Sequence, residues 1–205
     1  MISIVNYGIG NLGSVKNMLK KIGASCQFVS TADEVALAQK LILPGVGAFD
    51  MCMESLKNSG MFDSLNHAVL NKKIPILGIC VGYQMMTARS DEGKLQGLGW
   101  FDAETIKFKD DSAKMKIPHM GWNYITPRQT HPLVNSYKTT ATPARAYFVH
   151  SYYVKANQPQ HVALETNYIQ DFASGMIVDK MMGVQFHPEK SHRFGMQLFK
   201  SFAEL

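Results

Sequence analysis

One short stretch of the chain, Ile-Pro-Ile-Leu-Gly-Ile-Cys-Val-Gly at residues 74–82, constrains the fold more than any other. Its apolar first part predicts a buried strand, and the residues after Cys80, up to Ala88, have helical character. Gly78 and Gly82 stand two residues before and two residues after the cysteine. A sharp strand-to-helix turn requires this spacing, because a side chain at either position would clash. We therefore predict that the thiol of Cys80 leaves the sheet at such a turn.

The first ninety residues alternate between strand and helix patterns. Leu12, Val15, Leu19 and Ile22 recur on one helix face, and a strand pattern precedes them. The expected strands are 2–6, 26–29, 41–43 and 74–79, and the expected helices are 12–22, 48–56 and 62–70. This order favours an α/β fold with three αβα layers, in which helices cover both faces of a mostly parallel, flavodoxin-like sheet.

After about residue 99 the pattern changes to short β-rich segments separated by Pro, Asn and Gly. These segments are 101–108, 114–118, 146–154, 162–166, 172–178 and 181–186. We expect them to extend the same sheet as largely antiparallel strands. A last helix is expected over 191–205, with Ser191 as its cap. The chain shows no linker, so we expect one domain over residues 1–205.

Composition excludes several classes of function. The net charge of +5 is modest and no run of Lys and Arg exceeds two residues, so we expect a solvated surface and no nucleic-acid partner. The chain has three cysteines, and this small, odd number does not suit a disulfide framework. The cysteine count therefore favours a reducing cytoplasm. No apolar run approaches the roughly 18 residues of a membrane span, and the first residues lack the pattern of a signal peptide.

About a hundred residues after the cysteine, the chain contains His187-Pro188-Glu189. Among the seven histidines, only His187 is followed by a proline and then a carboxylate. The proline stiffens the link, so Glu189 can turn back to the imidazole and fix its tautomer. A cysteine, a base and an orienting acid predict nucleophilic catalysis by a Cys80-His187-Glu189 triad.

A glycine-rich turn, Pro-Gly-Val-Gly, follows the strand expected at 41–43. Its residues Gly45, Val46 and Gly47 lie at the carboxyl edge of the predicted sheet, where backbone N–H groups can turn toward a ligand. The N–H of Val81, directly after the cysteine, would be a further donor. Together they predict an oxyanion hole.

A rival motif lies near the start of the chain. Residues 8–13 read Gly-Ile-Gly-Asn-Leu-Gly and follow a strand, with Asp33 and Glu34 about twenty residues further on, as in dinucleotide-binding oxidoreductases. A lone motif of this kind is common wherever a strand turns tightly into a helix, so we favour a structural or interface turn. Two other readings are a non-catalytic subunit, which would lack a triad member, and a cysteine peptidase.

Residues 78–84 and 185–191 together resemble the motifs of class I, triad-type glutamine amidotransferases. Segments 7–12, 44–49, 118–123 and 147–152 extend this resemblance along the whole chain, in the family's order. The resemblance implies that Cys80 attacks the side-chain amide of glutamine, with His187 as the base that Glu189 holds. A γ-glutamyl thioester would form, ammonia would leave, and water would release glutamate.

The resemblance also implies binding sites and a partner, but no cofactor and no metal. Gln84 and the backbone of Ser151 and Tyr152 would seat L-glutamine. The branch of the family that fits best passes ammonia to a (β/α)8-barrel cyclase subunit of histidine biosynthesis, as a heterodimer. Six residues match its docking face: Asn11, Met120, Trp122, Asn123, Tyr147 and Lys190. Trp100 departs from that branch, so an alternative is the paralogous branch that feeds a sugar amidotransferase in surface-polysaccharide synthesis.

Overall fold

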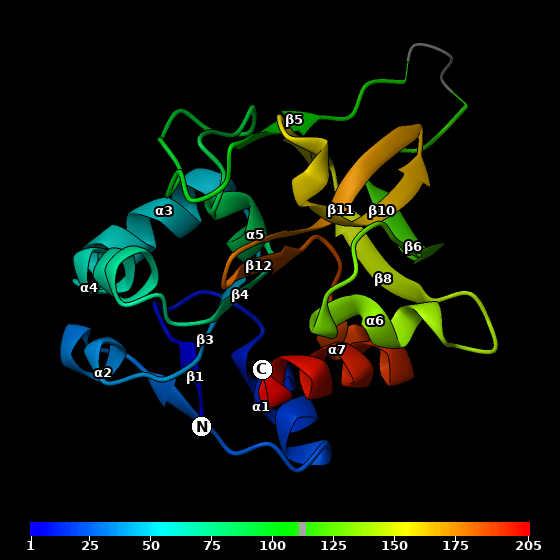
Figure 1. Ribbon diagram of the computed structural model, residues 1–205. Helices are drawn as coiled ribbons and strands as arrows, with labels where there is room; N and C mark the ends of the chain where they lie inside the picture. The colour runs from blue at the N-terminus through cyan, green and yellow to red at the C-terminus, as the bar shows by residue number, and fades with distance from the viewer. Residues whose placement is uncertain (111–113) are drawn as a thin grey trace.

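A computed structural model describes residues 1–110 and 114–205 of the protein (Figure 1). Its centre is an eight-stranded sheet with the order β2-β1-β3-β4-β12-β11-β10-β7. The first five of these strands run parallel, and the last three join antiparallel. The strands are β1 (Ile2–Val5), β2 (Cys26–Val29), β3 (Leu41–Gly45), β4 (Ile76–Cys80), β7 (Thr126–Pro127), β10 (Val162–Tyr168), β11 (Gln170–Val178) and β12 (Met181–Val184). The predicted α/β class is confirmed.

Helices cover both faces of this sheet (Figure 1). On one face α1 (Leu12–Lys21) packs against α7 (His192–Glu204), which also contacts α6 (Pro132–Lys138). The other helical segments are α2 (Ala32–Ala36), α3 (Phe49–Asn58), α4 (Phe62–Asn66), the π-helical η1 (His67–Asn71) and α5 (Val81–Met85). Within this second group α2 packs on α4, and α3 packs on α5. No helix among the described residues is long and apolar enough to cross a membrane.

Two small antiparallel ladders stand apart from the main sheet, so the expectation that every later strand extends it was wrong. One ladder joins β5 (Ala103–Lys107) to β9 (Tyr152–Ala156), and the other joins β6 (His119–Tyr124) to β8 (Arg145–His150). The strand expected over 146–154 therefore breaks at Ser151, because its two halves pair with different partners. The carbonyl of Ser151 accepts a hydrogen bond from the N–H of Phe108 at this break.

Several expected elements differ in their ends or are absent. No strand forms over 114–118, since Pro118 has no N–H to donate to a ladder, and the strand begins at the next residue. Helix α6 was not expected; its first turn is set by Pro132 and by the side chain of His131, which accepts from the N–H of Leu133. Helix α5 ends at Met85, and the helix expected over 62–70 is α4 followed by η1.

Ser191 precedes the last helix as expected, but its hydroxyl does not cap it. The hydroxyl donates to the carbonyl of His187 at 2.7 Å and accepts from the N–H of Tyr147 at 2.9 Å. Ser191 thus ties the segment that carries His187 to strand β8.

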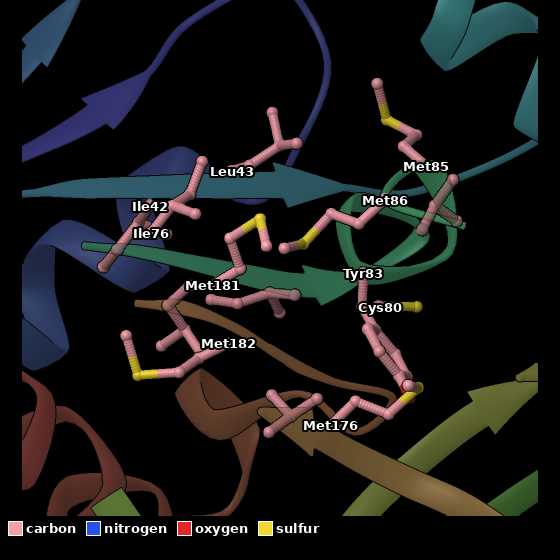
Figure 2. Close-up of a cluster of buried hydrophobic side chains, with 14 of the residues drawn as sticks. Ile42, Leu43, Ile76, Cys80, Tyr83, Met85, Met86, Met176, Met181 and Met182 are labelled. Atoms are coloured by element: carbon pink, nitrogen blue, oxygen red, sulfur yellow. The ribbon is translucent and has the colours of Figure 1, made fainter. Parts of the chain in front are cut away.

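The buried apolar side chains form one continuous cluster that surrounds the central strands. Figure 2 shows this cluster beside β4, rich in methionine, with the sulfur of Cys80 directed away from it. Methionine fills irregular spaces well because its side chain is unbranched and flexible. Tyr83 is fully buried here, and a Cβ at Gly183 would lie 2.1 Å from its ring. The start of α5 therefore packs directly on β12.

Candidate active site

Cys80 lies at the carboxyl end of β4 in a strained backbone conformation. Its φ of 54° and ψ of −112° are rare for a residue with a side chain, and such a conformation costs about 1–3 kcal/mol. A Cβ at Gly82 would lie 2.0 Å from the carbonyl oxygen of Leu43, and one at Gly78 would lie 2.5 Å from the sulfur of Met86. The sharp strand-to-helix turn predicted from the glycine spacing is therefore present, with the thiol 4% exposed at its apex.

The structure brings His187 and Glu189 beside this cysteine. His187 follows β12 and lies against β8, where its N–H donates to the carbonyl of Tyr147. Its Nδ1 lies 2.8 Å from Oε1 of Glu189, and both side chains are almost fully buried. Burial lowers the pKa of His187, but its hydrogen bonds to Cys80 and Glu189 outweigh this and raise the pKa to about 10. The imidazole thus bridges the thiol and the carboxylate.

The second carboxylate oxygen of Glu189 faces the first helix. Its Oε2 is buried and has no hydrogen-bond partner among the described residues. A cavity of about 270 Å³ lies on this side, lined by Ser14, Asn17, Met18, Lys21 and Glu189. Asn11, which was expected at the partner interface, approaches Oε1 of Glu189 with its amide nitrogen at 3.4 Å. The first residues of α1 therefore lie directly behind the triad.

The turn predicted as an oxyanion hole lies next to the cysteine. Two buried side chains hold its carbonyl groups: the hydroxyl of Tyr7 donates to the oxygen of Pro44 at 2.7 Å, and Sγ of Cys52 lies 3.4 Å from the oxygen of Val46. The N–H and C=O of one peptide point in opposite directions. The N–H groups of Gly45 and Gly47 therefore point away from these anchors.

One glycine of residues 8–13, Gly10, packs against the same turn. A Cβ at Gly10 would lie 3.1 Å from the ring of Pro44, and the φ of Gly10 is 125°. The first loop therefore packs against the oxyanion turn at close range. This contact explains the motif without a dinucleotide.

A cavity of about 490 Å³ opens in front of the cysteine. Its lining includes most of the residues predicted to act in the site, namely Val46, Gly47, Cys80, Val81, Gln84, Ser151, Tyr152 and His187. Gly45 and Glu189 do not line it. Gly45 packs against the start of α5, where a Cβ would lie 2.4 Å from the nitrogen of Gly82. Glu189 lies behind the imidazole.

Gln84 is buried, and its side-chain amide forms hydrogen bonds with other residues of the protein. Its amide nitrogen donates to the carbonyl of Tyr152 and to Oε1 of Gln185, both at 3.1 Å. The amide nitrogen of Gln185 in turn lies 3.9 Å from Sγ of Cys80. Gln84 therefore fixes the wall formed by Ser151 and Tyr152 relative to the cysteine.

Four residues that line the cavity were not predicted from the sequence: Glu92, Pro118, Val149 and His150. Glu92 is half-buried, and its Oε2 accepts from the N–H of Phe49 at the start of α3. Burial raises the pKa of this carboxyl above its ordinary value. No periodic pattern marks Glu92, because it lies in the loop after α5. Pro118 and His150 lie inside segments 118–123 and 147–152, which resemble the family's motifs. That resemblance was the sequence feature that could have pointed to these two residues.

Of the residues predicted to dock a partner, Lys190 lines the cavity and the other five do not. Met120 and Trp122 point outward from β6 and are 62% and 42% exposed. Lys190 lines the cavity, and its ammonium lies 5.8 Å from the ring centre of Tyr147. Asn123 differs, because its amide is used inside the protein, against His119 and the carbonyl of Asn167.

Trp100, the one departure from the favoured branch, is internal. Its indole N–H donates to Oδ1 of Asn66 at 2.8 Å, and the residue is 6% exposed. It therefore has no place on the docking face. Among residues 1–110 and 114–205, no group of three or more His, Cys, Asp or Glu side chains is arranged to hold a metal ion.

Comparison with known proteins agrees with this geometry. The family model for class I glutamine amidotransferases matches residues 3–204. The chain therefore belongs to the class I glutamine amidotransferase family, and it is an enzyme of the glutaminase type.

Relatives of high sequence identity indicate which branch of the family this chain resembles. The chain is 46% identical to imidazole glycerol phosphate synthase subunit HisH 2 of Pseudomonas aeruginosa, over the full length of both proteins. It is 47% identical to the subunit HisH 2 of Methanococcus maripaludis, over 98% of each chain. Among solved structures, PurLQS from Thermotoga maritima has a TM-score of 0.71 at 15% identity, covering 99% of this chain and 97% of that one. At that identity, the likeness concerns the fold alone.

Proposed function

We propose that this protein is the glutaminase subunit of an imidazole glycerol phosphate synthase, which hydrolyses glutamine through Cys80 and passes the ammonia to a cyclase subunit. One observation carries the proposal: the strained thiol of Cys80 and the imidazole of His187 line one cavity, and Glu189 holds that imidazole from behind. Full-length relatives with this printed name support the choice of acceptor.

The chemistry follows from the order of the three side chains. His187 takes the proton of the Cys80 thiol, Sγ attacks the amide carbon of glutamine, and the carbonyl oxygen becomes an oxyanion. His187 then protonates the amide nitrogen, so the C–N bond breaks and ammonia leaves behind a γ-glutamyl thioester. His187 next takes a proton from water, whose oxygen attacks the thioester, and glutamate leaves as the thiolate returns. Glu189 holds the imidazole in place throughout.

The cavity lining suggests how glutamine is oriented. The carboxylate of Glu92 suits the α-ammonium group, because it is the half-buried acid of the cavity wall. The backbone N–H groups of Ser151 and Tyr152 suit the α-carboxylate. The turn of Gly45, Val46 and Gly47, with the N–H of Val81, would surround the oxyanion, and loss of one such donor costs about 10²–10³ in rate.

A partner subunit is part of this function. Ammonia is protonated in neutral water and then ceases to be a nucleophile, so it must reach its acceptor without meeting bulk solvent. The docking face, which comprises Met120, Trp122, Tyr147 and Lys190, reaches the cavity at Lys190. We infer that a (β/α)8-barrel cyclase covers it, as a heterodimer in the cytoplasm, and that the isolated chain hydrolyses glutamine slowly.

The test compares two nitrogen sources. Cys80→Ala, assayed with the cyclase, should lose glutamine-dependent synthesis but keep synthesis from added ammonia, since the acceptor site is untouched. A variant that still uses glutamine would refute the role of Cys80. If wild-type protein delivers ammonia to a sugar amidotransferase and not to the cyclase, the catalytic assignment stands and the acceptor is wrong.

A further inference from the structure

Two buried histidines on the β6–β8 ladder take no part in the chemistry above. His119 and His150 lie directly opposite each other in the ladder, so their side chains share one face. Nδ1 of His119 lies 2.9 Å from Nε2 of His150, and the two residues are 3% and 6% exposed. In such a contact, one nitrogen must carry a hydrogen and the other must accept it.

The surroundings fix the direction of this hydrogen bond. Burial lowers the pKa of His119 to about 4 and that of His150 to about 3, so both rings are neutral at neutral pH. Nδ1 of His150 lies 2.7 Å from the carbonyl oxygen of Tyr152, which can only accept. Nδ1 of His150 therefore carries the hydrogen, its Nε2 accepts from Nδ1–H of His119, and Nε2 of His119 is left as an acceptor.

That last acceptor meets the amide of Asn123, whose nitrogen lies 3.2 Å away. Gly121 lies between the two residues on β6, with a φ of 121° and no side chain to separate them. The amide of Asn123 is held at its other contacts too: it donates to the carbonyl of Asn167, and its oxygen accepts from the N–H of Tyr124. The series of hydrogen bonds thus begins at the amide of Asn123, a donor held in place by its other contacts.

The other end of the chain is the wall of the glutamine cavity. The carbonyl of Tyr152 accepts both from His150 and from the amide of Gln84, at 2.7 and 3.1 Å. Ser151 and Tyr152 line the cavity, whereas His119 does not. The hydrogen bonds of His119 reach the cavity through His150, which lines it, and through the carbonyl of Tyr152.

We propose that His119 is a positioning residue for glutamine binding. The histidine relay, defined as Asn123, His119 and His150, holds the carbonyl of Tyr152 and links the cavity wall to the strand that carries the docking face. On β6, Trp122 and Tyr124 flank Asn123 and are exposed, so a partner that contacts them contacts the strand that carries the first member of the relay. The inference depends on the proposed glutaminase function.

A packing role for His119 is the competing explanation. Its ring stacks between Phe148 and Tyr168, with ring centres 4.7 and 4.0 Å apart. The test must therefore separate the hydrogen bond from the stacking.

Two amides of similar polarity make this separation at position 119. His119→Asn places an N–H where Nδ1 was, and His119→Gln places its amide where Nε2 was. With saturating cyclase, we expect H119Q to raise KM for glutamine about tenfold with kcat changed less than about threefold, and H119N to stay within about threefold of wild type in KM. Alkylation of Cys80 by iodoacetamide should proceed at the wild-type rate in both.

Further variants control for folding and packing. Phe148→Leu removes a stacking partner but no hydrogen bond, so it should lower the melting temperature and leave KM unchanged. Asn123→Ala keeps the rings of His119 and His150. At saturating cyclase it should raise KM for glutamine, as H119Q does. Equal KM values for H119N and H119Q, or a raised KM in Phe148→Leu, would overturn the inference. Wild-type protein without glutaminase activity beside its cyclase would instead overturn the proposed function.

Discussion

His187 is the residue at which burial and hydrogen bonding oppose each other most directly. Burial alone would favour the neutral ring, yet the bonds to Cys80 and Glu189 raise its pKa from 6.5 to about 10. A raised pKa in the folded state means that protonation stabilises the fold. This contribution is complete below about pH 6.5 and is lost as the pH rises through about 10.

We predict that Glu189→Gln separates the role of the acid from that of the base. The amide keeps the shape but not the charge, so kcat for glutamine hydrolysis should fall roughly 10²–10⁴-fold in a folded protein. The pKa of His187, followed by NMR titration, should fall as well, and the loss of unfolding free energy between neutral and alkaline pH should shrink. Glu204→Gln, an exposed carboxylate at the end of α7, is the control. Wild-type kcat in Glu189→Gln would contradict the triad.

Glu92 gives a second prediction at this scale. Glu92→Gln keeps an acceptor for the N–H of Phe49 but removes the charge facing the cavity, so KM for glutamine should rise about 10–100-fold while kcat changes little. In wild type, KM should also rise as the pH falls through the raised pKa of Glu92, because the protonated acid cannot pair with an ammonium group. This rise of KM at low pH should be absent in Glu92→Gln.

The matched control is Glu104→Gln. Glu104 is also a surface-accessible acid, but it pairs with Arg89 and does not line the cavity. Equal KM values in the two variants would show that Glu92 does not bind the α-ammonium group.

At the scale of elements, the turn from β4 into α5 depends on close backbone contact with β3. We predict that Gly82→Ala lowers the free energy of unfolding by about 3 kcal/mol or more, because the new Cβ would lie 2.0 Å from the carbonyl of Leu43 and neither backbone can retreat. Gly13→Ala is the control: it lies in α1 with open space around its Cβ, so it should stabilise by about 0.5–1 kcal/mol. Urea unfolding measures both, and equal midpoints would contradict the account.

The parallel half of the sheet could be predicted from the sequence because its signals are local. Strand β4 is a continuous apolar run, β1 is apolar except for Ser3, and the glycine spacing around Cys80 marks a turn within nine residues. His187 and Glu189 could be identified for the same reason, since the proline between them fixes their geometry.

The ladders could not be predicted in this way, because their pairing depends on distant residues. β6 and β8 are separated by strand β7 and helix α6, and nothing local shows that β8 pairs with β6 and not on the main sheet. Ser191 had the residue type of a helix cap, but tertiary contacts with His187 and Tyr147 took its hydroxyl. Glu92 faces the cavity from a loop, where no periodicity reveals which way a side chain points.

At the scale of the whole molecule, the cavity and the docking face share their residues. Lys190 lines the cavity and lies against Tyr147, while β8, which carries Tyr147, also holds the backbone of His187. A partner that covers the docking face would therefore lie beside the cavity at Lys190 and touch strand β8, which accepts a hydrogen bond from the backbone of His187. The surface at which ammonia leaves the cavity would then be the surface that contacts the partner.

Trp122 is the residue with which this surface can be tested. Its indole stacks on His192, with ring centres 5.5 Å apart, and lies 5.3 Å from the guanidinium of Arg145, so it is held in place before any partner binds. We predict that Trp122→Ala weakens binding of the cyclase by roughly 30-fold, since a preorganised, exposed tryptophan is typical of the residues that dominate interfaces. Titration calorimetry measures the Kd.

The control is Leu37→Ala, a side chain 84% exposed directly after α2, a helix that lies across the molecule from β6 (Figure 1). Leu37→Ala should change the free energy of unfolding by no more than about 0.5 kcal/mol, and Trp122→Ala should lower it by about 1 kcal/mol, because it also removes the contacts with His192 and Arg145. At saturating cyclase, Trp122→Ala should recover most of its glutaminase rate, since the triad is intact and only the occupancy of the complex has changed. An unchanged Kd would mean that the partner binds elsewhere, and ammonia would then have to leave the cavity by another route.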